Sequence, residues 1–179
     1  IIGSVYEFGA PKGTDFTLFH EHATFTDDSV LSGAVADCLL SGAAYADKFR
    51  KYTIAYPGRA YGAGFFDWVV SGSREPYNSW GNGSAMRVSP IGFAFEQLEG
   101  VMGAAKASAE VTHNHPEGVK GAQAVAVAIY LARSGYGKPY IKDHIQREFG
   151  YDLEQRLEDI RPNYKFDVSC QGSVPESII

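Results

Sequence analysis

Residues 119–133 constrain the fold more than any other segment. This run is rich in alanine and valine, and its apolar side chains lie nearly all round a helical projection. A helix that is hydrophobic on every side belongs in the interior of a domain. The β-branched valines would also suit a buried strand, but the length of the run and the start signal Pro116-Glu117-Gly118 favour a helix. We therefore predict a helix buried at the centre of the domain.

The remaining apolar segments also repeat with helical spacing. Between residues 29 and 40, apolar side chains recur at i, i+3, i+4, i+7 and i+8, as on one face of a helix. No segment shows a clear period-2 strand pattern, so the chain is predicted to be all-α, a single compact multi-helix domain over residues 1–179. Further helices are expected over residues 43–56, 65–70, 84–95 (kinked or split by Pro90 and Gly92), 97–111 and 140–149, with a short one within 151–166.

The two ends of the chain read as parts of helices. Residues 1–7 look like the later part of a helix without a cap. Residues 173–179 look like the opening turn of another helix, with Ser173 as its cap and Pro175 near its start. Both patterns suggest a fragment of a larger protein.

Composition limits the classes of function. The chain has 179 residues, of which 45% are hydrophobic and 21% charged, as in an ordinary globular protein with one core. Its net charge of −5 argues against binding to a nucleic-acid backbone. No apolar run approaches the roughly 18–20 residues of a membrane span, so no membrane partner is expected. Cys38 falls on an apolar helix face and Cys170 is far from it, which favours free thiols in a reducing cytoplasm.

An acidic tetrad, Phe25-Thr26-Asp27-Asp28, precedes the helix expected from Ser29. One hydroxyl and two carboxylates within a turn offer the hard oxygen ligands that Mg²⁺ or Mn²⁺ prefers. Adjacent carboxylates repel each other, and a shared cation would relieve that repulsion. The alternative is an ordinary solvated helix N-cap.

A glycine-containing loop, Gly81-Asn82-Gly83-Ser84-Ala85-Met86, precedes another apolar segment. Small residues before a helix N-terminus suit an anion such as a pyrophosphate, although a tight turn would explain them equally well. The aromatic loop over residues 56–65 could stack on an adenine or simply pack in the core. His113 and His115 form an H-x-H pair, but no third and fourth zinc ligands are evident near them.

Four segments together carry a family resemblance. They are the acidic tetrad, residues 76–87 (PYNSWGNGSAMR), residues 112–118 (THNHPEG) and residues 167–175 (DVSCQGSVP). With these segments the chain resembles the ADP-ribosylglycohydrolase family, of the dinitrogenase-reductase-activating glycohydrolase type, over essentially its whole length. Members of that family are all-helical enzymes that remove ADP-ribose using two divalent metal ions.

The resemblance assigns roles to residues of this chain. It implies that Thr26, Asp27 and Asp28 bind Mg²⁺ or Mn²⁺. Asp27 and Asp28 would also be catalytic by positioning the attacking water, with Glu7 as a gate or auxiliary base. The substrate-binding residues that it implies are Gly81, Asn82, Gly83, Ser84, Met86 and His113, with His113 near the distal ribose and His115 supporting the turn.

The chain departs from the family pattern in one important respect. The late Gly-Gly-Asp-x-Asp-Thr motif, which completes the two-metal centre in the family, does not occur in these 179 residues. We therefore expect a partial domain that lacks the C-terminal part, with ADP-ribose or an ADP-ribosylated protein as its ligand. Turnover should be low unless a second polypeptide supplies the missing ligands. The alternative is a non-catalytic ADP-ribose-binding module or a structural relative.

Overall fold

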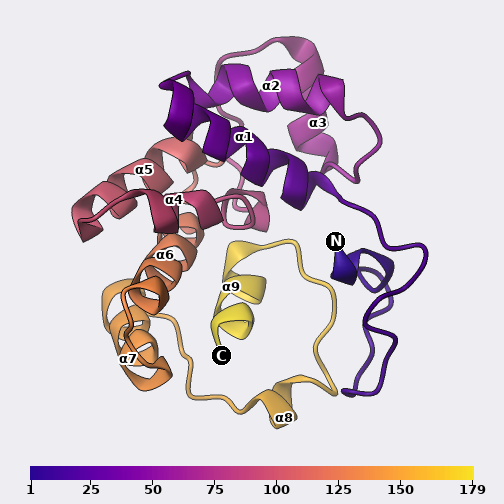
Figure 1. The fold of residues 1–179 in the computed structure, drawn as a ribbon, viewed down its shortest axis with the longest axis vertical. Helices are drawn as coiled ribbons and strands as arrows, with labels where there is room; N and C mark the ends of the chain where they lie inside the picture. Colours follow the sequence, from indigo (N-terminus) through magenta and orange to yellow (C-terminus); the bar gives the residue numbers. More distant parts are fainter.

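The structure is a computed structural model that describes residues 1–179, and all its regular elements are helices, as predicted (Figure 1). Two short 3₁₀ helices, η1 (Ile2–Val5) and η2 (Asn82–Ser84), accompany the α-helices. The α-helices are α1 (Asp27–Ser41), α2 (Tyr45–Ala55), α3 (Ala63–Ser71), α4 (Ser89–Ala94), α5 (Leu98–Glu110), α6 (Pro116–Arg133), α7 (Lys138–Phe149), α8 (Leu157–Ile160) and α9 (Cys170–Ile178). The chain forms no strand, only one isolated antiparallel bridge between Gly81 and Ser169.

Helix α6 is the central element, which confirms the prediction from its apolar run. It packs against α4, α5, α7 and α9. Pro116 occupies its first turn, and the Nδ1 atom of His115 accepts a hydrogen bond from the Glu117 amide at 3.1 Å, so His115 caps the helix. Its buried residues are mostly small, which lets neighbouring helices approach closely.

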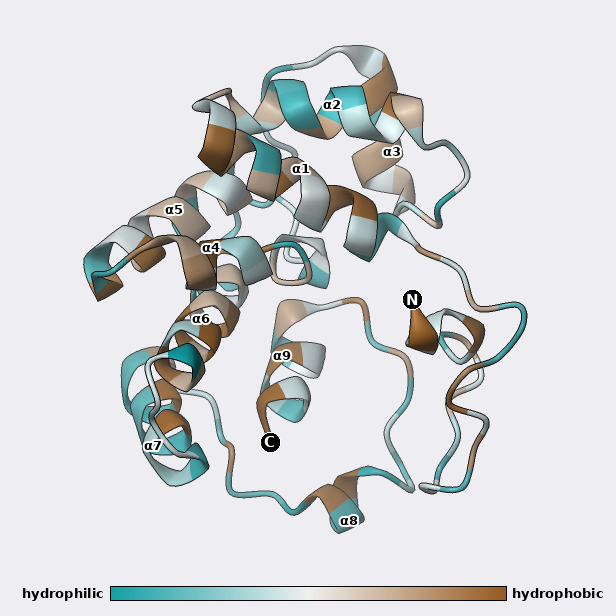
Figure 2. Cartoon of the chain, viewed as in Figure 1, coloured by the Kyte–Doolittle hydropathy of each residue, from teal (hydrophilic) through white to brown (hydrophobic).

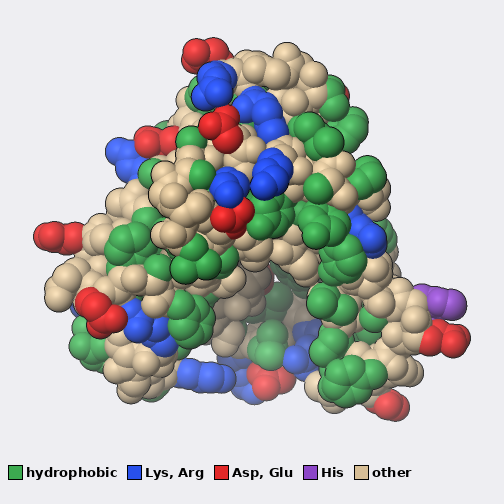
Figure 3. Space-filling model, turned by 45° about the horizontal axis from the view of Figure 1, so that its top comes forward, with side chains coloured by type: hydrophobic (Ala, Val, Ile, Leu, Met, Phe, Trp, Pro, Cys, Tyr) green, Lys and Arg blue, Asp and Glu red, His purple; other side chains and the backbone are tan.

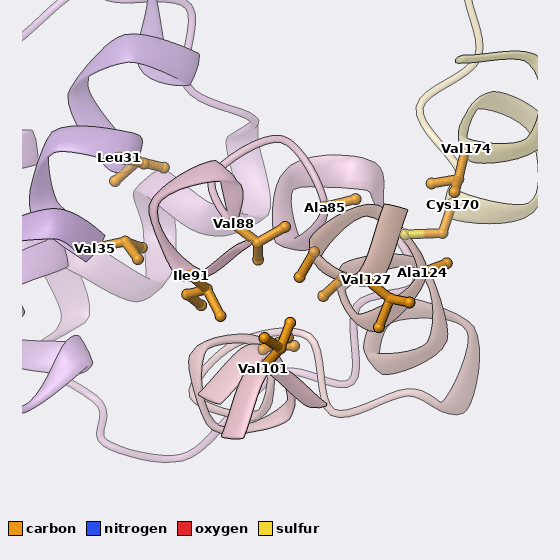
Figure 4. Packing of buried hydrophobic residues seen from close by; sticks show 14 of the residues in the cluster. Leu31, Val35, Ala85, Val88, Ile91, Val101, Ala124, Val127, Cys170 and Val174 are labelled. Atoms are coloured by element: carbon orange, nitrogen blue, oxygen red, sulfur yellow. The ribbon is translucent and has the colours of Figure 1, made fainter. Parts of the chain in front are cut away.

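The core lies where α1, α4, α5 and α6 meet. Figure 4 shows Val88 and Ile91, at the start of α4, between Leu31 of α1 and Val127 of α6. On the far side of α6, Cys170 of α9 belongs to the same buried cluster. Hydrophilic residues gather on α2 and α7 at the periphery (Figure 2). No helix in the structure combines the length and hydrophobicity required to cross a membrane.

Two expectations about element boundaries need correction. Residues 1–7 form only the single 3₁₀ turn η1 and not part of an α-helix. Helix α9 begins at Cys170, so Pro175 lies inside it and not at its start. Its cap is Ser169, whose hydroxyl accepts a hydrogen bond from Gly172 N at 2.9 Å. Ser173 cannot serve as the cap, because its hydroxyl donates to Ser169 O at 2.5 Å inside the first turns of the helix.

The segment over residues 84–95 is split, as its Pro and Gly suggested. The short helix η2 ends at Ser84, and α4 begins at Ser89 with Pro90 in its first turn. This break turns the chain between η2 and α4, and the loop before η2 becomes part of the wall of a large cleft.

Candidate functional site

A cleft of about 1080 Å³ hollows the molecule. Figure 3 shows the molecule hollowed in its lower half, between the side that carries α7 and the side that carries the N-terminal segment. Its walls come from η1, the start of α1, the loop before η2, and α9. Pockets for small organic ligands occupy about 300–1,000 Å³, so this cleft has room for a dinucleotide-sized molecule.

The acidic residues meet in this cleft. Glu7, Asp27 and Asp28 all line it, although Glu7 follows η1 and the two aspartates begin α1. Thr26 is the N-cap residue of α1, but its hydroxyl donates to Asp28 Oδ2 at 2.9 Å and caps no backbone amide. The main chain is held in place because Asp27 N donates to Arg59 O at 2.7 Å.

Burial and the repulsion between neighbouring charges raise the pKa values of Asp27 and Glu7. Partial burial, followed by the charges of Asp28 and Glu7, raises the pKa of Asp27 to about 7. The pKa of Glu7 is also raised, by burial first and then by the charge of Asp28. No basic side chain forms an ion pair with any of the three.

This arrangement fits the ligand chemistry of a hard cation, but only part of a coordination shell. Carboxylate and hydroxyl oxygens are the ligands that Mg²⁺ and Mn²⁺ prefer, and a cation would relieve the repulsion that raises the pKa of Asp27. No group of three or more histidine, cysteine or acidic side chains lies close enough together to hold a metal ion. The residues present therefore offer oxygen ligands of the right kind, but they do not form a complete metal site.

The glycine-containing loop is shaped by the late part of the chain. Asn82 N donates to Val168 O at 2.7 Å, and Cys170 N donates to Trp80 O at 3.0 Å. The side-chain amide of Asn82 donates to Asp167 O and to Ser173 Oγ, both at 3.1 Å. These bonds fix the backbone of the loop against the segment that leads into α9.

Two glycines of this loop lie against His113. Gly81 and Gly83 both line the cleft, and neither carries a side chain that would press on the imidazole ring. A Cβ atom at Gly83 would lie 3.2 Å from His113 Nε2, and one at Gly81 would lie 3.6 Å from the same atom. The residue Gly118 of α6 must also lack a side chain, because a Cβ there would lie 2.7 Å from Ser79 O.

Ser84 is the one residue of the expected binding set that the structure turns away from the cleft. Its side chain is fully buried, and its hydroxyl donates to Gly118 O at 2.7 Å. The other expected residues line the cleft: Gly81, Asn82, Gly83, Met86 and His113. Their role in binding remains a prediction.

His113 lies almost completely buried in the wall of the cleft. Only 4% of its surface is exposed, and its ring packs edge-on against Tyr77, with the centroids 5.7 Å apart. Burial, together with the positive charge of Arg87, lowers the pKa of His113 to about 3. The imidazole is therefore neutral at physiological pH.

The resemblance implies that Arg87 packs or pairs behind the cleft, but Thr112 is a functional candidate that the sequence did not reveal. Both are fully buried behind His113, and Arg87 also borders the cleft. The hydrogen-bond partners of Arg87 are a backbone carbonyl and a hydroxyl. Because neither is an acidic side chain, no charge pattern in the sequence indicates this contact. The aromatic loop before α3 packs internally, with Tyr61 stacked on Phe65 at a centroid distance of 6.0 Å.

Comparison with known proteins identifies the class to which this fold and cleft belong. A sequence model of the family described as ADP-ribosylglycohydrolase matches residues 2–176, so the chain belongs to that family. It is 32% identical to the ADP-ribosylhydrolase ARH3 of Homo sapiens and 30% identical to that of Mus musculus, in each case over 154 residues, or 75% of this chain and 42% of the relative. It is 30% identical to the ARH3 of Gallus gallus over 177 residues, or 88% of this chain and 45% of the relative. The chain thus spans less than half the length of these relatives.

Proposed function

We propose that the cleft binds ADP-ribose and that the protein acts in hydrolysis of the bond between ADP-ribose and a protein side chain or a small acceptor. One observation carries the proposal: the acidic pair Asp27 and Asp28 and the glycine loop with His113 line the same cleft. Membership of the family and similarity to ADP-ribosylhydrolases support the reaction class.

Residues of the glycine loop supply the binding half of this function. Gly81 and Gly83 line the cleft without side chains, so the pyrophosphate and the neighbouring ribose can approach their backbone closely. Bonds from the late segment hold this backbone in one shape before the ligand arrives, which reduces the entropy lost on binding. His113 then offers a ring nitrogen to a ribose or phosphate oxygen.

Residues of the acidic group supply the reactive half. Thr26, Asp27 and Asp28 would hold Mg²⁺ or Mn²⁺. When bound, such an ion would polarise a ribose oxygen of the substrate and lower the pKa of a water molecule bound to it. Asp27 and Asp28 orient the attacking water by accepting its hydrogen bonds. Glu7, in the same cleft, gates the access of substrate or accepts a proton as an auxiliary base.

The 179 residues contain no second acidic motif, so we propose that this chain alone turns over slowly. Two divalent ions held close together require more carboxylate charge than Asp27, Asp28 and Glu7 provide. In this reading, additional ligands would come from further sequence or from a second polypeptide.

Calorimetry with ADP-ribose and with Mg²⁺, followed by an assay for ADP-ribose released from a modified protein, tests the function. We expect binding of both ligands and slow release. Asp27→Asn and Asp28→Asn should abolish release, whereas Asp67→Asn, which changes an exposed aspartate on α3, should not.

Other outcomes separate the competing functions. Binding of ADP-ribose with no release under any metal condition would identify a non-catalytic binding module. Folded protein that gives no heat with either ligand would reject the proposal and leave a structural relative.

A further inference from the structure

Arg87 is a buried cation without a carboxylate partner. Its guanidinium lies 4.2 Å above the ring of Phe49, and its side chain has no exposed surface. One terminal nitrogen, NH2, donates to Ser108 O at 2.7 Å and to Thr112 Oγ1 at 3.0 Å, while Nε and NH1 have no hydrogen-bond partner. A buried charge is unfavourable unless it is paired and hydrogen-bonded. The presence of an incompletely bonded guanidinium at this position therefore requires an explanation.

The bond to Thr112 fixes the direction of a second hydrogen bond. A guanidinium can only donate, so Thr112 Oγ1 must accept from Arg87. Thr112 is fully buried, and its only other side-chain partner is Nδ1 of His113, at 2.7 Å. The hydroxyl proton is satisfied only if it points to that nitrogen, since a buried hydroxyl donor without an acceptor is unfavourable.

The protonation of His113 follows from this direction. If Nδ1 accepts from Thr112, then in the neutral ring the proton must sit on Nε2. The imidazolium form would place a second proton on Nδ1, against the hydroxyl proton and near the charge of Arg87. Tyr77, the other titratable group that packs on the ring, is held neutral because burial raises its pKa to about 12.

The free nitrogen of His113 faces the glycine loop. Nε2 has no hydrogen-bond partner in the protein, and Cβ atoms built at Gly83 and Gly81 would lie 3.2 and 3.6 Å from it. Because His113 borders the cleft, a ligand lying along Gly81 and Gly83 would meet an N–H group at this point.

We propose that Arg87 and Thr112 are positioning residues that hold His113 in its neutral Nε2–H form, so that the ring acts solely as a hydrogen-bond donor to an oxygen of the ligand beside Gly81 and Gly83. The identity of that oxygen rests on the proposed function, since the phosphates and ribose of ADP-ribose offer acceptors of this kind. A ligand that presents only a donor, such as an ammonium group, is excluded from this position.

Nitrogen-15 NMR of histidine-labelled 179-residue chain tests the relay without any ligand. We expect His113, assigned by its loss in His113→Asn, to show a protonated Nε2 and an unprotonated Nδ1. Thr112→Val, which replaces the hydroxyl by a methyl group of similar size, should give a mixture of both tautomers. Thr112→Ser, which keeps the hydroxyl, should restore the single form. A second variant, Arg87→Met, should also give a mixture, because Thr112 Oγ1 then no longer accepts from Arg87 and can accept from an Nδ1–H group instead.

The relay is overturned if His113 carries its proton on Nδ1, or if it keeps a pure Nε2–H form in both Thr112→Val and Arg87→Met. Should Arg87→Met fail to fold, the comparison of Thr112→Val with Thr112→Ser still decides the question.

Calorimetry with ADP-ribose on the same proteins separates this proposal from the proposed function. We expect Thr112→Val to bind about tenfold more weakly and Thr112→Ser to bind like the unmodified chain, as the loss of one oriented hydrogen bond predicts. No binding by the unmodified chain, with the tautomer as expected, would reject the proposed ligand but not the relay. Normal binding with the wrong tautomer would reject the relay but not the ligand.

Discussion

Two groups in the cleft have pKa values displaced in opposite senses for a common reason. Burial favours the neutral form of each, so the pKa of Asp27 rises to about 7 and that of His113 falls to about 3. Their neighbours reinforce the shift, with like charge beside each one: Asp28 beside the aspartate and Arg87 beside the histidine. The cleft is therefore uncharged at His113, and its acidic side chains are those of Glu7, Asp27 and Asp28.

The displaced pKa of His113 predicts a loss of stability in mild acid. In the unfolded chain a histidine takes up a proton near pH 6.5, while folded His113 stays neutral until about pH 3. The unfolded state therefore binds more protons, and the free energy of unfolding falls as the pH drops below 6.5, by about 1.4 kcal/mol per pH unit. Between pH 7 and pH 5 the unmodified chain should lose about 2 kcal/mol more than His113→Asn in urea titrations.

Asp27 acts with the opposite sign in this range, because its folded pKa is raised, but it is present in both proteins and cancels in the comparison. Equal losses for the two proteins would show that His113 titrates normally in the folded state.

The acidic pair predicts stabilisation by a divalent cation. Mg²⁺ at ten times its Kd should raise the free energy of unfolding by about 1.4 kcal/mol, since it binds only the folded site. Asp28→Asn should remove this effect and, without metal, should raise the melting temperature because it relieves the repulsion on Asp27. Thermal scans with and without MgCl₂ measure both changes, with Asp67→Asn as the control. A Mg²⁺ effect of the same size in Asp28→Asn would place the ion elsewhere.

At the scale of single residues, the sequence predicts what depends on local spacing. His115 could be assigned to the turn before α6 because Pro116 and Glu117 follow it, and it caps that helix. The inward turn of Ser84 depends on Gly118, far along the chain, and no local pattern announces it.

Among the contacts between helices, the one between α6 and α9 leaves the least room for a larger side chain. A Cβ atom at Gly121 of α6 would lie 2.5 Å from Cys170 Sγ, so the two helices touch through a glycine. The glycine Gly103 of α5 has no atom within 4 Å of the place where its Cβ would stand. Both glycines lie in the interior of a helix, but only Gly121 is packed against a neighbouring helix.

These glycines form a matched pair for mutation. Gly103→Ala should stabilise the chain by about 0.5–1 kcal/mol, because alanine is the better helix former. Gly121→Ala has the same gain in helix propensity but must push α9 away, and should destabilise by about 1–3 kcal/mol. Urea unfolding measures both. A stabilising Gly121→Ala would show that α9 does not lie against α6 as described.

Helix positions followed from the sequence more reliably than helix starts. The apolar pattern located α1 and α6. A helix buried on one face has apolar residues at helical spacing, and a helix buried on all faces has a continuous apolar run. The start of α9 was misplaced because Ser169 and Ser173 are both plausible caps, and only the contact of the preceding residues with the glycine loop decides between them. The all-α class was predicted correctly for the same reason that α6 was.

For the molecule as a whole, the cleft could not be predicted as a shape. Its walls come from segments separated by more than a hundred residues, and their proximity depends on tertiary contacts that have no local signature. The family resemblance did group the acidic tetrad with the glycine loop, and the structure brings those segments to one cleft. It implied that Arg87 packs or pairs behind the cleft, but it gave no indication that Thr112 links Arg87 to His113.

The distribution of buried residues predicts unequal stability across the molecule. No side chain is buried within residues 1–29 or within residues 154–168, whereas α6 is rich in buried residues. Amides in these two segments should exchange with solvent much faster than those of α6, since opening them exposes little apolar surface. Hydrogen–deuterium exchange followed by mass spectrometry checks this order. Protection of residues 1–29 equal to that of α6 would contradict it.

The bonds between the glycine loop and the segment before α9 have a consequence for biosynthesis. Gly81 to Gly83 leave the ribosome long before Asp167 and Val168, whose carbonyl groups hold Asn82. During that interval the nascent chain has its central helices but no partner to shape the loop. The ligand binding proposed for this cleft should therefore be acquired only after α9 has been translated.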